Sequence, residues 1–243
     1  MKRFLAKFLI TFCLLFLLAG CGLETGYYTL DEPTASHSPS GTEDAENNYW
    51  EFIAPHGVND AAYPGFYKGV KIYYKIYNNT STLNTHINAI YTANDNSSST
   101  EKYDNEGGFN KLNSYGYKGL YTSSDIEFIN HSNSDVRIKL RLVDDGDFGK
   151  SIVIAGSDTG VYPYRSAKDS DTEKQDFAFD SEYFPKSENN NNNDGDVVIS
   201  KTATKEGTWY INAYAVCTAQ DEGFQSYHSR LCHLGYITIK QKD

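Results

Sequence analysis

The 243-residue chain has little positive charge, a single methionine, and no long apolar run after its first twenty residues. Its 22 Lys and Arg face 32 Asp and Glu, a formal net charge of −10, whereas a nucleic-acid binder needs a basic surface. Without further apolar runs the chain is not a polytopic membrane protein. What it does have is 39% hydrophobic residues and 20 tyrosines, which exclude a wholly disordered chain and favour strands.

The common enzyme motifs are also missing: G-x-S-x-G, H-E-x-x-H, the P-loop and G-x-G-x-x-G. The triplet Asp158-Thr159-Gly160 resembles the active-site triplet of aspartic proteases. That chemistry requires two carboxylates that share a proton, and the chain has no second copy of the triplet. Carboxylates are abundant enough to leave a glycosidase pair open, but no pair stands out. We therefore expect a protein that is not an enzyme and uses no cofactor.

The first twenty residues have the layout of an export signal. Three basic residues precede the apolar stretch 8–18, and two small residues then lead to Cys21. The segment Leu18-Ala19-Gly20-Cys21 resembles the lipobox of bacterial lipoproteins. The resemblance implies that residues 1–20 are removed as a signal peptide and that Cys21 is lipidated, which anchors the chain to a bilayer without spanning it. The alternative is an ordinary secretory signal with an incidental cysteine.

Removal of the signal makes the exported chain more acidic. It takes away three basic residues, so 19 Lys and Arg remain against 32 Asp and Glu, a formal charge of −13. Such a body is repelled by an anionic membrane face, and the lipid is the expected anchor. Gly22 after the cysteine favours the outer membrane over the inner under the sorting rule described for some enteric bacteria. We expect a lipid-anchored protein of the bacterial cell envelope, with its leaflet open.

Composition divides the exported chain into a tether and a body. Residues 21–48 are polar, acidic and interrupted by proline, which predicts a flexible linker. Residues 49–243 are predicted to form a single domain; two smaller domains split near Thr122–Asp125 are the alternative. The asparagine-rich run 189–193 and the acidic turn after it predict an exposed loop.

The body alternates apolar and polar residues with a period of two. The pattern is clearest over Val70–Tyr77, Val136–Leu142 and Trp209–Cys217, and it is typical of antiparallel strands with one buried face. Shorter candidate strands are Glu51–Ala54, Ile126–Ile129, Ser151–Ala155, Phe177–Phe179, Val197–Ser200 and Tyr236–Lys240. No segment of ten or more residues predicts a capped amphipathic helix. The fold class expected is all-β, an antiparallel β-sandwich. Trp209–Ile239 weakly resembles the last hairpin of fibronectin type III or immunoglobulin-like domains.

Tyrosines suggest where such a body would bind. Ten of the 20 fall between Tyr63 and Tyr121. If Tyr74 faces the core, four side chains lie on the opposite, solvent-facing side of the same strand: Lys71, Tyr73, Lys75 and Tyr77. Tyrosine offers a large contact area with a polar tip, so this face is the candidate binding surface. The alternative is that a loop or another part of the sheet covers it.

The remaining cysteines, and the residues of the types that bind metals, are expected to have structural rather than catalytic roles. Cys13 leaves with the signal, so Cys217 and Cys232 are a candidate disulfide, with two unpaired core thiols as the alternative. His228 and His233 are nearby in sequence, but zinc is not expected because Cys232 and His233 are adjacent and point to opposite faces. The run 190–201 fails the calcium-loop pattern at both ends, and the acidic turn 144–147 is more typical of solvated acids. No metal site is expected.

Together these features predict a non-enzymatic, lipid-anchored module that binds a protein or a glycan. Its partners would be the bilayer, through Cys21, and an unknown ligand, with no role in binding nucleic acid. A structural or assembly lipoprotein of the envelope is the second hypothesis, and a lipid-tethered hydrolase is the third.

Overall fold

We describe a computed structural model of the chain. It describes residues 29–39, 49–95, 106–121, 128–129, 136–141, 152–155, 163–165, 175–177, 195–202 and 207–240. The strands are β1 Thr34–His37, β2 Tyr49–Ala54, β3 Tyr67–Tyr77, β4 Lys118–Gly119, β5 Phe128–Ile129, β6 Val136–Arg141, β7 Ile152–Ala155, β8 Tyr164–Arg165, β9 Gln175–Asp176, β10 Val197–Val198, β11 Thr208–Gln220, β12 Ser226–His228 and β13 Cys232–Lys240. The helices are α2 His56–Ala62, α3 Thr80–Asp95 and α4 Glu106–Ser114.

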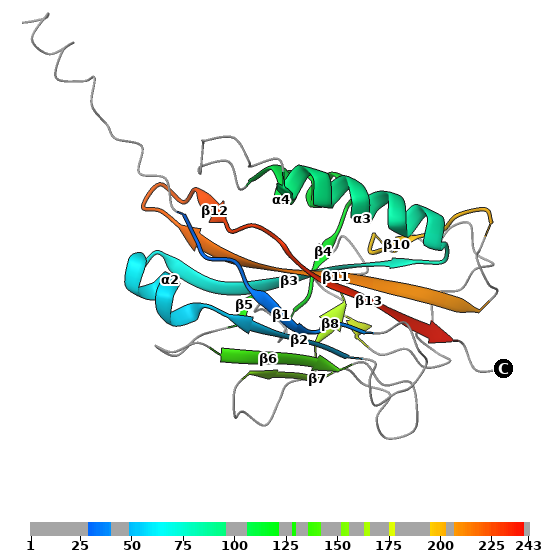
Figure 1. Cartoon of the computed structure of the whole chain (residues 1–243), viewed down its shortest axis with the longest axis horizontal. Coiled ribbons are helices and arrows are strands. Elements are labelled where there is room, and N and C mark those ends of the chain that lie inside the picture. Colours follow the sequence, from blue (N-terminus) through cyan, green and yellow to red (C-terminus); the bar gives the residue numbers. More distant parts are fainter. Residues whose placement is uncertain are drawn as a thin grey trace, which may run out of the picture.

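The largest sheet is built on the two long strands β3 and β11, which run antiparallel in the middle of the molecule (Figure 1). On one side β11 pairs with β12 and β13. On the other side β3 pairs with the short strands β4 and β5 and, in parallel, with β10. The prediction of a β-rich fold with antiparallel sheets is confirmed.

A second, four-stranded sheet has the order β1-β2-β6-β7 and antiparallel pairing throughout. Its strand β1 lies within the segment predicted to be a flexible tether, so that prediction is wrong for residues 29–39. The physical reason is visible in Leu30, which is buried in the core, and in the pairing of Thr34 with Ile53 of β2. Burial of the Leu30 side chain and backbone pairing with β2 therefore order a segment whose composition is typical of a linker.

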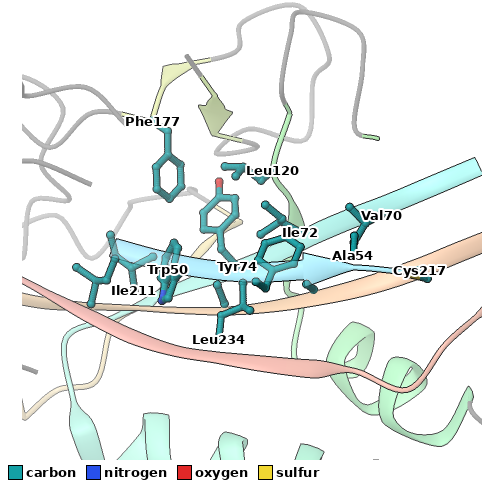
Figure 2. Packing of buried hydrophobic residues seen from close by; sticks show 14 of the residues in the cluster. Trp50, Ala54, Val70, Ile72, Tyr74, Leu120, Phe177, Ile211, Cys217 and Leu234 are labelled. Carbon is teal, nitrogen blue, oxygen red and sulfur yellow. The ribbon is translucent and has the colours of Figure 1, made fainter. Parts of the chain in front are cut away.

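The main core lies between the two sheets (Figure 2). Trp50 and Ala54 of β2 pack in the same cluster as Val70 and Ile72 of β3 and Ile211 of β11. The rings of Tyr74 and Phe177 pack in a T-shaped arrangement, with centroids 4.7 Å apart and planes at 87°. The core therefore joins residues from both sides of the alternative domain boundary near 122–125.

Helices α3 and α4 cover the other face of the large sheet (Figure 1). The sequence predicted no helix of this length, and α3 alone has 16 residues. Asn79 caps the start of α3: its Oδ1 accepts a hydrogen bond from the backbone N–H of Thr82 at 3.0 Å. In α3 the buried side chains Leu83 and Ile90 are seven residues apart, which is about two helical turns. The Thr and Asn residues between them weaken the apolar pattern that would predict a helix. In the part of the chain that the structure describes, no helix is long and apolar enough to cross a bilayer.

Candidate functional site

The predicted binding surface on β3 is buried rather than exposed. Tyr77 is fully buried, and Tyr73 packs edge-on against Phe109 of α4, with ring centroids 5.4 Å apart. Lys75 is also buried, and its Nζ donates to the carbonyl oxygen of Gly116 at 3.0 Å. Lys71 is partly buried. The expectation that these four side chains form an open face is therefore wrong, because Tyr77 and Tyr73 pack with residues of α3 and α4 and Lys75 is buried against Gly116.

A hydrogen-bonded network fills the space beneath the helices. The Tyr77 hydroxyl donates to the Tyr117 oxygen at 3.1 Å and lies 3.0 Å from Nδ1 of His86. Tyr117 also accepts a 2.7 Å hydrogen bond from Nδ2 of Asn212. Oδ1 of Asn212 lies 2.8 Å from Nε2 of His233. The network therefore runs from α3, through β3, to β11 and β13.

Electrostatics keep this network neutral near pH 7. Burial raises the pKa of Tyr117 to about 12 and raises that of Tyr77 further, so both phenols stay protonated. Burial lowers the pKa of His86, and also that of His233, whose ring is partly open to solvent. A neutral, mutually satisfied network orients the helix layer on the sheet and holds no charged acid or base for catalysis.

A second pairing holds the start of α4 against β12. Nδ1 of His228 lies 3.0 Å from Oε2 of Glu106, and the backbone N–H of His228 donates to Oε1 of the same carboxylate. The ring of Phe109 stacks on His228 with centroids 3.6 Å apart. Because Glu106 is bonded to backbone as well as to the ring, this contact docks the helix.

The candidate disulfide is not formed: Cys217 and Cys232 are free cysteines. Cys232 lies opposite Ala215 in the β11–β13 register, not opposite Cys217. Cys217 is buried, lies 3.5 Å from the hydroxyl of Tyr67, and burial raises its pKa to about 12. Burial likewise raises the pKa of Cys232, to about 11. Both thiols are therefore protonated and poorly reactive, which matches the alternative of two unpaired core thiols.

Several predicted features lie outside the described residues: Cys21 of the lipobox, the triplet at 158–160, the acidic turn at 144–147 and the asparagine run at 189–193. Within the described ranges, no group of three or more His, Cys, Asp or Glu side chains is placed to hold a metal ion.

The outer face of α3 is the surface that sequence reasoning missed. Tyr91 is 67% exposed, and it is the exposed tyrosine among those the structure describes. Among the side chains of the helix that the structure describes, the exposed ones around it are uncharged, namely Ser81, Asn84, Thr85, Asn88 and Thr92. We call Tyr91 and these five residues the α3 face. Tyr91 lies in the tyrosine-rich segment 63–121, but its exposure could be recognised only once the helix was known.

The α3 face offers hydrogen-bonding groups without charge. The hydroxyls of Thr85 and Thr92 donate back to the carbonyl oxygens of Ser81 and Asn88, both at 2.9 Å. Their oxygens remain available as acceptors, and the amides of Asn84 and Asn88 can both donate and accept. An exposed aromatic ring among adaptable polar groups is a composition that suits recognition of another molecule.

Comparisons of the chain with protein-family models, with curated proteins and with solved structures give no match.

Proposed function

We propose that this chain is a lipid-anchored protein of the bacterial cell envelope whose body is a non-enzymatic binding module for a protein or a glycan. In this proposal lipidation at Cys21 supplies the anchor, and the α3 face supplies the contact surface. The two sheets that share the core fit an elaborated antiparallel β-sandwich, an architecture common in cell-surface domains.

The observation that carries the proposal is the exposure of Tyr91 on the α3 face, whose described side chains carry no charge. Exposed helix positions are usually occupied by strong helix formers and by charged pairs that stabilise the helix. The α3 face has Ser, Thr and Asn there, although 22% of the whole chain is charged. A face that is poor for helix stability and rich in hydrogen-bonding groups is better explained by contact with a ligand.

The buried chemistry supports a binding role over an enzymatic one. Burial raises the pKa values of the described thiols and of the tyrosines in the network, so these groups stay protonated and unreactive near pH 7. The histidines of the network are hydrogen-bonded to side chains that position them. These groups stabilise the protein, which leaves surface contacts as the better candidate for function.

The proposal is tested with the full lipidated chain in detergent, screened against glycan arrays and envelope or host proteins. We expect Tyr91→Ala to lower the affinity for the identified ligand about tenfold or more, as for a central aromatic contact. Phe224→Ala is the matched control, since it removes another exposed aromatic ring that belongs to the β11–β12 hairpin and not to the α3 face, and it should bind normally.

Two results would contradict the proposal. Normal binding by both Tyr91→Ala and Asn88→Ala would remove the α3 face as the contact surface. A photo-crosslinker at position 91 that captures only further copies of this chain in intact cells would favour the structural or assembly hypothesis instead.

A further inference from the structure

The hairpin that joins β11 to β12 displays an apolar side chain at its tip. Phe224 is 81% exposed and has a backbone φ of 63°, in the left-handed region that bulky residues rarely adopt. Glycine adopts that conformation without strain, but the neighbouring Gly223 is not among the residues with positive φ. The chain nevertheless holds the phenylalanine there, which indicates that the outward position of its ring matters.

The tip is a turn held by hydrogen bonds to Asp221. The backbone N–H of Phe224 donates to the carbonyl oxygen of Asp221 at 3.0 Å, and that of Gln225 donates to its Oδ1 at 2.9 Å. The hydroxyl of Tyr227 donates to Oδ2 at 3.0 Å. Since Asp221 fixes both the backbone and the following strand, the ring of Phe224 is directed by the turn.

This tip lies at the end of the body where the described chain begins. The N–H of Gln220, at the base of the hairpin, donates to the carbonyl oxygen of Phe66 at 2.9 Å. Tyr63 lies three residues before Phe66, and its hydroxyl is hydrogen-bonded to both the N–H and the carbonyl oxygen of Thr29. Figure 1 shows α2 and the hairpin at the same end, and on α2 Val58 is 51% exposed.

Chain length relates this end to the expected anchor. Thr29 follows Cys21 by eight residues. Even fully extended, eight residues reach about 29 Å, and as a random coil they reach about 15 Å. A lipid on Cys21 therefore keeps the end that carries Thr29, Val58 and Phe224 close to the bilayer.

We propose that the hairpin tip contacts the bilayer that holds the lipid anchor, with the ring of Phe224 at the lipid–water boundary. This inference rests on the lipid anchoring in the proposed function. It orients the body, because a second attachment point limits its rotation about the tether. Glu222 is exposed beside Phe224 and the exported chain is acidic, so the contact suits zwitterionic lipids and is weakened by anionic ones.

The test uses the full lipidated chain with Phe224→Trp, reconstituted into phosphatidylcholine vesicles with and without brominated acyl chains. The two native tryptophans, Trp50 and Trp209, are buried, so their emission is subtracted with the wild-type chain. We expect the emission of the new Trp to be blue-shifted and to lose about half or more of its intensity to the bromine. Tyr91→Trp is the matched control on the α3 face, and its emission should be unaffected.

The outcomes separate this inference from the proposed function. Unquenched, solvent-like emission from Phe224→Trp in chains that do float with the vesicles overturns the membrane contact and leaves the anchor intact. Wild-type chains that fail to float, or Cys21→Ser chains that float equally well, overturn the lipid anchor itself. Stronger quenching in phosphatidylglycerol than in phosphatidylcholine vesicles would overturn the preference for zwitterionic lipid.

Discussion

The two faces of the large sheet are both buried, yet they are built from different side chains. The face toward the four-stranded sheet is mainly aliphatic, as in Val70, Ile72 and Ile211. The face toward α3 and α4 carries tyrosines and Asn212, linked by hydrogen bonds. The first face is held by apolar burial, which is tolerant of geometry, whereas the second depends on each polar group finding its partner. Polar residues that alternate with apolar ones along a strand can thus mark a second buried face held by hydrogen bonds, and not only a face in contact with solvent.

The largest effect is expected at the buried pair of Arg165 and Asp196, on the aliphatic side of the described structure. Nε and Nη2 of Arg165 donate to the two carboxylate oxygens of Asp196, at 2.9 and 3.0 Å, and both side chains are buried. The Tyr74 hydroxyl donates to the same carboxylate at 2.7 Å. Asp196→Ala should lower the free energy of unfolding by about 3–5 kcal/mol, because it removes the carboxylate that pairs through both oxygens with a buried guanidinium.

Urea unfolding followed by the fluorescence of the buried tryptophans measures this loss. The double variant Arg165→Met/Asp196→Leu is the control: removing both charges should restore most of the stability. A single-variant loss below about 1 kcal/mol, the range of a surface ion pair, would contradict the assignment.

A smaller effect is expected on the tyrosine side. Tyr117→Phe removes the oxygen that accepts hydrogen bonds from Tyr77 and from the fully buried Asn212. The loss should be about 1–3 kcal/mol, since a buried donor is left unsatisfied while the ring still packs. Tyr115→Phe, on a half-buried neighbour that stacks on His86, should change stability by about 0.5 kcal/mol or less. Equal losses in the two variants would argue against the network.

The smallest expected effect is a pH dependence confined to the tyrosine side. The pKa values of His86 and His233 are lowered in the folded protein, chiefly by burial. Above about pH 6.5 both states are neutral and the two rings add no pH dependence. Below that pH the unfolded chain takes up protons first, so the stability falls as the solution is acidified.

Unfolding free energies between pH 7.5 and pH 5.5 test this dependence. The decline in the wild-type chain should be smaller in the double variant His86→Gln/His233→Gln, while the other histidines are common to both proteins. Identical declines would show that these two rings do not titrate as the structure indicates.

Particular residues show how far the sequence could be interpreted. The alternation over β3 and β11 correctly predicted which side of each strand packs against the aliphatic core, because a period of two follows directly from strand geometry. The same alternation was wrong about Tyr73 and Tyr77, since it contains no information on what covers the second face. Helix α3 was missed because its Thr, Ser and Asn residues have weak helix propensity, and packing on the sheet stabilises it instead.

The candidate surface could be predicted only in part for the same reason. Tyr91 belongs to the tyrosine-rich segment that the sequence singled out, but its exposure depends on the orientation of α3. Phe224 carried no signal in the sequence, because its left-handed backbone belongs to a turn whose hydrogen bonds to Asp221 are visible only in the structure.

By itself the sequence determined the strand-rich composition, the acidity of the chain and the expectation of a lipid anchor, all of which can be read from the residues without their contacts. Only the tertiary structure decided that the tyrosine face is covered, that the two thiols remain apart, and that part of the predicted tether pairs as β1. Those outcomes depend on contacts between residues far apart in the chain, where the free energy of burying several segments together outweighs the preferences of any one of them.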